Sequence, residues 1–163
     1  YPNLHIIHFD AHTDLRDDYM GEKLSHATVL RRCHDILGDG RIYQFGIRSG
    51  DRSEFRWAEE GHVTTNKFNF NGLEEAIKEI DNKPVYLTID LDVLDPSEFP
   101  GTGTPEAGGV SYMQLLNAIF TVCKNANVVA CDINELSPTY DQSGISTALA
   151  CKVVRELLLA LKK

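Results

Sequence analysis

The first residues with an obvious chemical use are two acids and a histidine at two-residue steps. Asp10, His12 and Asp14 lie in the segment DAHTD, directly after an apolar run. Alternate side chains of extended backbone point the same way, so all three can face one centre. Carboxylates this close repel one another unless a cation lies among them. The spacing therefore indicates a metal site.

A second acidic segment repeats this pattern farther along the chain. Asp90 and Asp92 begin the segment DLDVLDP, which also follows an apolar run. Carboxylates with few imidazoles suit Mn²⁺ better than they suit a thiolate-type Zn²⁺ site. The four aspartates carry four negative charges, which two divalent cations cancel, and a carboxylate can bridge ions roughly 3.5–4 Å apart. The two segments together predict a two-metal site.

Alternating strands and helices must position these acids. Apolar, strand-forming runs lie at residues 4–9, 41–47, 84–89 and 126–133. Helical patterns lie at residues 25–37, 53–60, 71–80, 111–123 and 143–161. Strands that are apolar on both faces are typical of a parallel sheet sandwiched by helices, so we expect an α/β fold in one domain, residues 1–163. Ligands bind at the carboxyl ends of strands in such sheets, and the acidic segments follow strands there.

Composition and charge exclude several classes of function. The 163 residues suffice for one domain with a sizeable core. The net charge of -8 argues against a nucleic-acid surface, which needs basic residues. The longest apolar runs are too short to span a bilayer, and no charged segment followed by an apolar one resembles a signal peptide. We therefore expect a cytoplasmic protein that binds neither nucleic acid nor membrane.

The other histidines and the cysteines lie in no pattern that indicates chemistry. His5 and His8 fall within a strand, and we expect them to be packed rather than to bind metal. His34 and His62 have no supporting pattern. No C-x-x-C pair occurs, so we expect four reduced core thiols: Cys33, Cys123, Cys131 and Cys151.

Three segments resemble the signatures of the ureohydrolase superfamily, which includes arginases and agmatinases. They are DAHTD, DLDVLDPSEFPGTGTPEAGG and CDINELSPTYDQSG. The segments DLRDDYMGEKLSHATVLRR and PGTGTPEAGG look most like agmatinases. The resemblance implies an arginase-like three-layer α/β/α fold with two Mn²⁺ ions at the strand ends.

The resemblance also implies a role for each acidic residue of the two metal-binding segments. Asp10 and Asp90 would bridge the two ions. His12 and Asp92 would complete one ion. Asp14 would bind the other ion and contact the nucleophile.

One metal ligand of the superfamily is not found in this chain. Members supply a further His from a Gly-Gly-Asp/Glu-His-Ser segment before the first signature, and no such segment occurs here. The chain begins at Tyr1 rather than Met and enters a strand-like run almost at once. We therefore expect the missing His upstream of Tyr1, and we expect these residues to be the C-terminal portion of a longer catalytic domain.

Substrate-binding and proton-transfer residues follow from the same resemblance. Glu135 matches the carboxylate that holds the substrate guanidinium as a planar, bidentate pair. His26 matches the histidine that passes a proton to the leaving amine. Thr104 matches a threonine near the guanidinium, although it could equally only shape its glycine-rich loop.

The loop after the first signature bears on the choice of substrate. Its acids Asp17, Asp18 and Glu22 would repel a carboxylate and tolerate an amine-bearing tail, whereas Arg16 could pair with a carboxylate. We therefore expect a small cationic guanidino substrate, foremost agmatine, which would be cleaved to putrescine and urea in polyamine biosynthesis. We also expect a homo-oligomer.

Other functions remain open at this point. The protein could be another ureohydrolase, namely an arginase, guanidinobutyrase or formiminoglutamase, or an inactive homologue that holds metal or polyamine. The pair of Glu135 and His26 argues against the inactive homologue. The acidic loops disfavour a dinuclear phosphoesterase. The doubled aspartate pattern disfavours a one-zinc deacetylase on the related fold.

Overall fold

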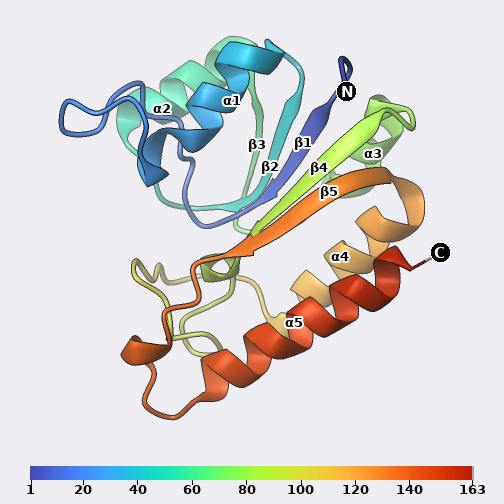
Figure 1. The fold of residues 1–163 in the computed structure, drawn as a ribbon. Helices are drawn as coiled ribbons and strands as arrows, with labels where there is room; N and C mark the ends of the chain where they lie inside the picture. Colours follow the sequence, from blue (N-terminus) through green and yellow to red (C-terminus); the bar gives the residue numbers. More distant parts are fainter. Residues whose placement is uncertain (163) are drawn as a thin grey trace.

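The chain folds around one parallel sheet. A computed structural model describes residues 1–162. Its five strands lie in the order β3-β2-β1-β4-β5, and every neighbouring pair is parallel (Figure 1). The strands are β1 (His5–Phe9), β2 (Ile42–Ile47), β3 (Thr64–Lys67), β4 (Pro84–Asp90) and β5 (Asn127–Asn134). The expected parallel α/β fold is confirmed.

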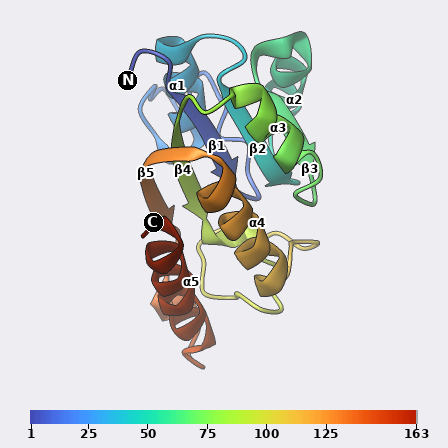
Figure 2. The same ribbon diagram turned by 90° about the vertical axis from the view of Figure 1, so that its right-hand side faces the viewer.

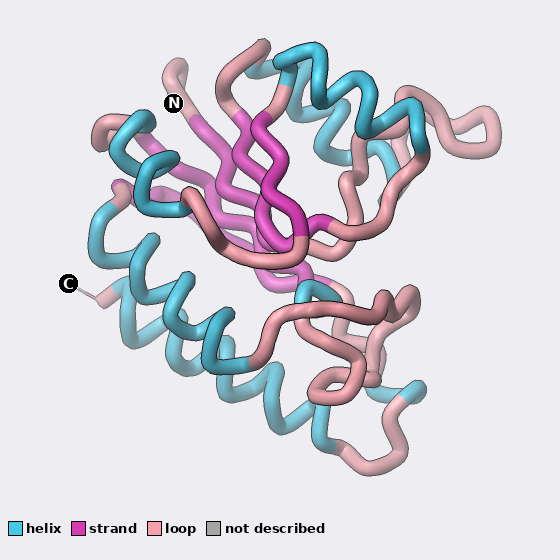
Figure 3. The backbone as a smooth tube through the Cα atoms, turned by 180° about the vertical axis from the view of Figure 1, so that it is seen from behind, coloured by secondary structure: helices cyan, strands magenta, loops and turns pink. Residues whose placement is uncertain are grey.

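Helices cover both faces of this sheet. One face carries α1 (Val29–Leu37) and α2 (Arg52–Trp57). The other face carries α3 (Leu73–Ile80), α4 (Tyr112–Asn125) and α5 (Ile145–Leu161). Figures 1 and 2 show the two helical layers, and Figure 3 shows the loops gathered at one edge of the sheet. Right-handed crossovers produce this division, because the chain reverses direction across the sheet between β3 and β4.

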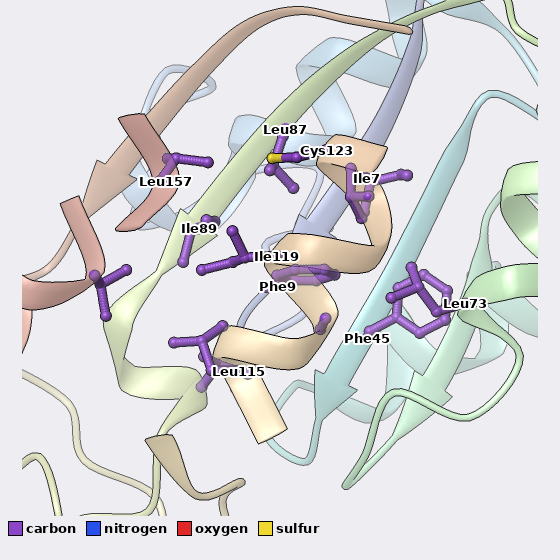
Figure 4. Close-up of a cluster of buried hydrophobic side chains, with 14 of the residues drawn as sticks. Ile7, Phe9, Phe45, Leu73, Leu87, Ile89, Leu115, Ile119, Cys123 and Leu157 are labelled. Atoms are coloured by element: carbon purple, nitrogen blue, oxygen red, sulfur yellow. The ribbon is translucent and has the colours of Figure 1, made fainter. Parts of the chain in front are cut away.

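Two apolar clusters hold the layers together. The larger lies between the sheet and helices α3, α4 and α5, where Phe9, Leu87 and Ile119 are fully buried (Figure 4). The smaller lies under α1 and α2 and includes Leu30 and Val63. Burial of one such side chain stabilises the fold by about 1.5–3 kcal/mol. Phe9 and Ile89, which directly precede Asp10 and Asp90, belong to the larger cluster, so its packing anchors these strand ends.

Three elements differ from the sequence expectation. β5 was expected to be buried, but it lies at the sheet edge and all its residues are at least partly exposed. β3 was not expected, because its polar residues lack an apolar run and only backbone pairing with β2 defines it. The helix expected over residues 53–60 ends at Trp57. A π-helical turn, Ala58–His62, follows it, and Gly61 within this turn has a φ of 98°.

The cysteines also differ in part from expectation. All four are thiols, but only Cys123 is buried, whereas Cys33 and Cys131 are partly exposed. The expectation of a core thiol is wrong for Cys151, which lies on an exposed position of α5. A helical sequence pattern cannot by itself distinguish a core position from a solvent-facing one. Among residues 1–162, no helix has the length and apolar character needed to cross a membrane.

Candidate metal centre and active site

The acidic segments lie side by side because β1 and β4 are neighbours. Phe9 pairs with Ile89 in the parallel register, which places Asp10 and Asp90 next to each other at the strand ends. Backbone N–H groups then orient the carboxylates: Ala11 N donates to Asp92 Oδ1 at 3.1 Å, and Asp92 N donates to Asp90 Oδ1 at 2.9 Å. The site is thus built by the sheet and fixed by the backbone around it.

One cavity of about 590 Å³ collects the eight residues that the sequence predicted for metal binding, proton transfer and guanidinium binding. Its lining residues follow the carboxyl ends of β1, β4 and β5. Figure 3 shows the loops that gather at these strand ends. The residues lining the cavity include Asp10, His12, Asp14, His26, Asp90, Asp92, Thr104 and Glu135. These residues come from five separate segments of the chain, so the tertiary fold is what brings them together.

Burial and like charge strongly perturb the acids of this cavity. Burial, together with the charges of Asp10 and Asp92, raises the pKa of Asp90 to about 11. Burial and the charge of Asp10 raise the pKa of Asp14 to about 7. Carboxylates in such surroundings take up protons or cations. The cavity is therefore electrostatically suited to positive ions.

His12 places an imidazole between the two acidic segments. Burial alone would lower the pKa of His12, but its close contacts with the carboxylates of Asp10 and Asp92 raise it to about 10. His12 Nδ1 lies 3.0 Å from Asp92 Oδ2, and that buried oxygen accepts no hydrogen bond. An orphaned carboxylate oxygen facing an imidazole nitrogen is a pair of ligand atoms for one divalent cation. The residues present therefore fit a metal site.

His8 has a role that the sequence did not reveal. It is buried as expected, but its Nε2 lies 2.8 Å from Asp10 Oδ2. Gln44 Nε2 donates both to Thr13 O at 2.7 Å and to His8 Nδ1 at 3.1 Å, so His8 donates from Nε2 to Asp10. The two-residue step from His8 to Asp10 was the available signal, since it places both side chains on one face.

Asp14 and Glu135, which both line the cavity, have unusual backbone conformations. Their φ angles are 53° and 65°, in the left-handed region that few residues other than glycine adopt. Glu135 directly follows β5 and is exposed, whereas Asp14 is partly buried. Strained conformations of this kind persist where the surrounding structure fixes them, and they concentrate at functional sites.

The glycine-rich loop of residues 95–109 is pinned at both ends. The Asp95 carboxylate accepts hydrogen bonds from the backbone N–H groups of Gly108 and Gly109, at 3.0 and 3.1 Å. A Cβ on Gly109 would lie 2.4 Å from Asp95 N, so only glycine fits there. Thr104 lines the cavity from this loop, and a Cβ on Gly103 would lie 3.6 Å from Glu135 Oε2. The loop thus forms a wall beside Glu135.

Arg48 is a second residue that the sequence did not reveal. Its guanidinium donates to the carbonyl oxygens of Asp92 at 2.7 Å and of Glu106 at 2.9 Å, and also to those of Val93 and Leu94. It therefore joins the metal-binding turn to the glycine-rich loop. No sequence motif surrounds Arg48, so only the structure shows this role.

The predicted proton-transfer residue lies at the mouth of the cavity. His26 is exposed, begins the 3-10 turn His26–Thr28, and packs edge-on against Tyr19 at 5.2 Å between ring centroids. Arg16 also lines the cavity and lies 5.2 Å from the Tyr19 ring. This group is the side of the cavity that a substrate tail would contact.

The acids of the loop after the first signature do not line the cavity, unlike what the substrate argument assumed. Asp17 is exposed and receives a hydrogen bond from Arg32 at 2.9 Å, and Asp18 accepts one from Gly21 N at 2.8 Å. Asp17, Asp18 and Glu22 are not among the residues lining the cavity. The lining acids in that region are Asp51 and Glu54 instead. Local sequence could not show which acids of a loop turn toward a site.

Known proteins resemble this chain closely. The model of the arginase family matches residues 1–160. The agmatinase of Bacillus anthracis is 49% identical over 161 residues, which cover 98% of this chain and 56% of the relative. The human mitochondrial guanidino acid hydrolase is 40% identical over 172 residues, which cover 97% of this chain and 48% of the relative.

Solved structures agree with these relatives. The agmatine ureohydrolase of Thermoplasma volcanium superposes with a TM-score of 0.86 at 36% identity, over 99% of this chain and 56% of that one. The chain thus spans about half the length of the relatives it matches. The match runs through all three signature segments and both helical layers. By sequence and by fold, the chain belongs to the arginase family.

Proposed function

We propose that the cavity is the hydrolytic site of a ureohydrolase that cleaves agmatine to putrescine and urea. The observation that carries the proposal is the convergence of all eight candidate residues on one cavity at the strand ends. Relatives named agmatinase, at 46–49% identity, support the same activity.

We propose that the aspartates and His12 hold two Mn²⁺ ions. Asp10 belongs to two groups of possible ligand atoms and Asp90 lies beside it at the strand ends, so these two carboxylates would be shared between the ions. His12 lies 3.0 Å from Asp92 and forms one group of possible ligands with Asp92 and Asp10, whereas Asp14 forms another with Asp10. Two divalent cations would make a water molecule nucleophilic near neutral pH and offset the repulsion of these acids. Asp14 would accept a hydrogen bond from the attacking water and orient it.

The guanidinium group needs a planar anion opposite the nucleophile. Glu135 is suited to this role because it extends into the cavity beside Thr104, and carboxylate–guanidinium pairs form two parallel hydrogen bonds. Such a pair holds the guanidinium carbon in place for attack. His26, at the mouth of the cavity, gives a proton to the nitrogen that leaves as the amine of putrescine.

The charges of the cavity favour a cationic substrate. Seven carboxylates line it, whereas Arg16 is the only lysine or arginine among the lining residues. Clefts lined by one sign of charge attract ligands of the opposite sign. Agmatine carries a guanidinium and an amine, which suit such a cavity. Arg16 is the one observation that favours a guanidino acid instead, as in the human relative.

A comparison of substrates tests the proposal. The full-length protein, stripped by a chelator and reloaded with Mn²⁺, should release urea from agmatine with a higher kcat/KM than from arginine or 4-guanidinobutyrate. Mg²⁺ alone should restore less activity than Mn²⁺, and metal analysis should find two Mn²⁺ per chain. A preference for 4-guanidinobutyrate that disappears in Arg16→Ala would show that the substrate is a guanidino acid rather than agmatine. Absence of urea from every substrate would refute the ureohydrolase.

A further inference from the structure

Three side chains that the proposed reaction does not use converge at the amino ends of the strands, opposite the catalytic cavity. His34 lies near the end of α1, Asp39 lies in the turn before β2, and His62 lies just before β3. They therefore surround the amino ends of the strands, whereas the catalytic cavity lies at the carboxyl ends. Their potential ligand atoms all lie within 4.8 Å of one another.

Both imidazoles converge on the Asp39 carboxylate. His34 Nε2 and His62 Nδ1 both lie 2.7 Å from the same oxygen, Asp39 Oδ1. Two imidazole nitrogens and a carboxylate oxygen, which are three possible ligand atoms, thus lie close together. Metal–ligand distances in such sites are about 2.0–2.2 Å, so an ion needs the donors to move apart slightly. Asp39 can move, because 65% of its side chain is exposed.

Neighbouring side chains fix both imidazole rings. The Trp57 indole stacks on His62 with 4.5 Å between centroids and an interplanar angle of 16°. Its ring also meets His34 edge-on, at 4.6 Å and 87°. The Arg31 guanidinium lies 3.9 Å from the Trp57 centroid and holds the indole in turn. The rings are therefore oriented before any ligand arrives, which lowers the entropic cost of binding.

We propose that His34, Asp39 and His62 form a second, separate metal site that binds one divalent cation of the Zn²⁺, Co²⁺ or Ni²⁺ type. Imidazole nitrogens suit these ions, whereas the acid-rich cavity suits Mn²⁺. Water completes the coordination on the exposed side of Asp39. The ion replaces the protons that the rings now donate to Asp39, because a coordinating imidazole must be deprotonated.

The bound ion has a structural role. It links the end of α1 to the turn before β3, and both segments cover the smaller apolar cluster that includes Leu30 and Val63. A ligand that binds only the folded state stabilises it by mass action. This inference does not depend on the reaction proposed for the cavity.

Calorimetric titration of the Mn²⁺-loaded protein with Zn²⁺ tests this site. We expect one saturable site that is weakened about 100-fold or more in His62→Asn and in Asp39→Asn, since even outer-shell changes cost 10–100-fold. Glu60→Gln is the matched control. Glu60 Oε2 lies 3.8 Å from the other nitrogen of His62, Nε2, so its loss removes a nearby charge but no ligand. The control should keep the parent affinity, and urea release should be unchanged in all these variants.

Trp57 offers a second measurement at the site itself. It is the only tryptophan of the sequence and contacts both imidazoles. Co²⁺ should quench its fluorescence in the parent and in Glu60→Gln but not in His62→Asn, and Zn²⁺ should reverse the quenching. Circular dichroism verifies that each variant is folded. If His62→Asn does not fold, the test rests on Asp39→Asn, because Asp39 is exposed and its substitution leaves the core intact. Equal Zn²⁺ affinity in the parent and Asp39→Asn, or no Zn²⁺ binding by the parent, would overturn the proposal.

Discussion

The acidic cavity and the His34–Asp39–His62 cluster use the same two residue types in opposite ways. In the cavity, seven carboxylates outnumber two imidazoles, and Asp10 and Asp90 lie at strand ends. In the cluster, two imidazoles share one exposed carboxylate. The cavity lies at the carboxyl ends of the strands and the cluster at the amino ends. The ratio of carboxylates to imidazoles and the burial of the carboxylates, rather than the residue types, distinguish the two sites.

The effect of this difference appears in the acids themselves. Burial and like charge raise the pKa of Asp90 to about 11. Hydrogen bonds from His34 and His62 instead lower the pKa of Asp39 below its ordinary range. Without an ion, the cavity therefore contains mutually repelling acids, whereas the cluster is already satisfied. Removal of metal should accordingly change the cavity far more than the cluster.

The largest expected effect is that of Asp90→Asn. The amide keeps the shape of the side chain but removes one bridging charge, so we expect Mn²⁺ binding to weaken and kcat/KM to fall about 1000-fold, which corresponds to about 4 kcal/mol. Metal analysis and a urea assay on the full-length protein measure both. Near-normal turnover would show that Asp90 does not hold the ions.

The same variant should have the opposite effect on the metal-free protein. The raised pKa of Asp90 means that folding takes up a proton above pH ~4, the ordinary range of an aspartate. The stability of the metal-free parent protein therefore falls as the pH rises toward 11. Asn has no such dependence, so chelated Asp90→Asn should melt above the chelated parent at pH 7, and this gain should shrink at pH 4. A lower melting temperature at pH 7 would contradict the account of buried repulsion.

A smaller effect is expected of His26→Asn. General acid catalysis contributes about 10²–10⁴-fold, so kcat should fall about 100-fold while KM and Mn²⁺ content stay unchanged. The ring packs against Tyr19, so its loss leaves the carboxylates in place. Tyr19→Phe, which keeps that contact, is the matched control. A parallel loss of Mn²⁺ would assign His26 to metal binding or structure.

The smallest expected effect is that of Asp39→Asn on the metal-free protein. Because the pKa of Asp39 is lowered in the folded state, its contribution to stability is present above pH ~4 and is lost as the pH falls further. Thermal melting should show a slightly lower Tm than the parent at pH 7 and no difference at pH 2–3. A large difference at pH 7 without metal would show that the cluster, too, is tightly coupled to folding.

The sequence predicted the acidic cavity well because its signals are local. Asp10 and Asp90 each end an apolar run, and parallel strands place such ends along one edge. The roles proposed for Glu135 and His26 came only from the family resemblance, and the structure adds their place on the cavity wall. The positions of Asp17 and Asp18 were misjudged, because the turn of a loop depends on contacts such as that with Arg32.

The features that escaped prediction depend on tertiary contacts. His34 and His62 are far apart in sequence and meet only because α1 and the π turn pack around Trp57. Arg48 acts through backbone carbonyls, which leave no trace in residue types. The exposure of β5 depends on its place at the sheet edge, which its apolar residues do not reveal.

The left-handed backbone at Asp14 and Glu135 restricts how this site can diverge. Most L-residues lose about 1–2 kcal/mol at such angles, whereas glycine loses nothing and asparagine little. Most substitutions at either position therefore destabilise the backbone, whatever their effect on the chemistry, and β-branched residues destabilise it most. Lineages that abandon the chemistry but keep the fold should accumulate glycine and asparagine at these two positions, so their composition would record the loss of activity.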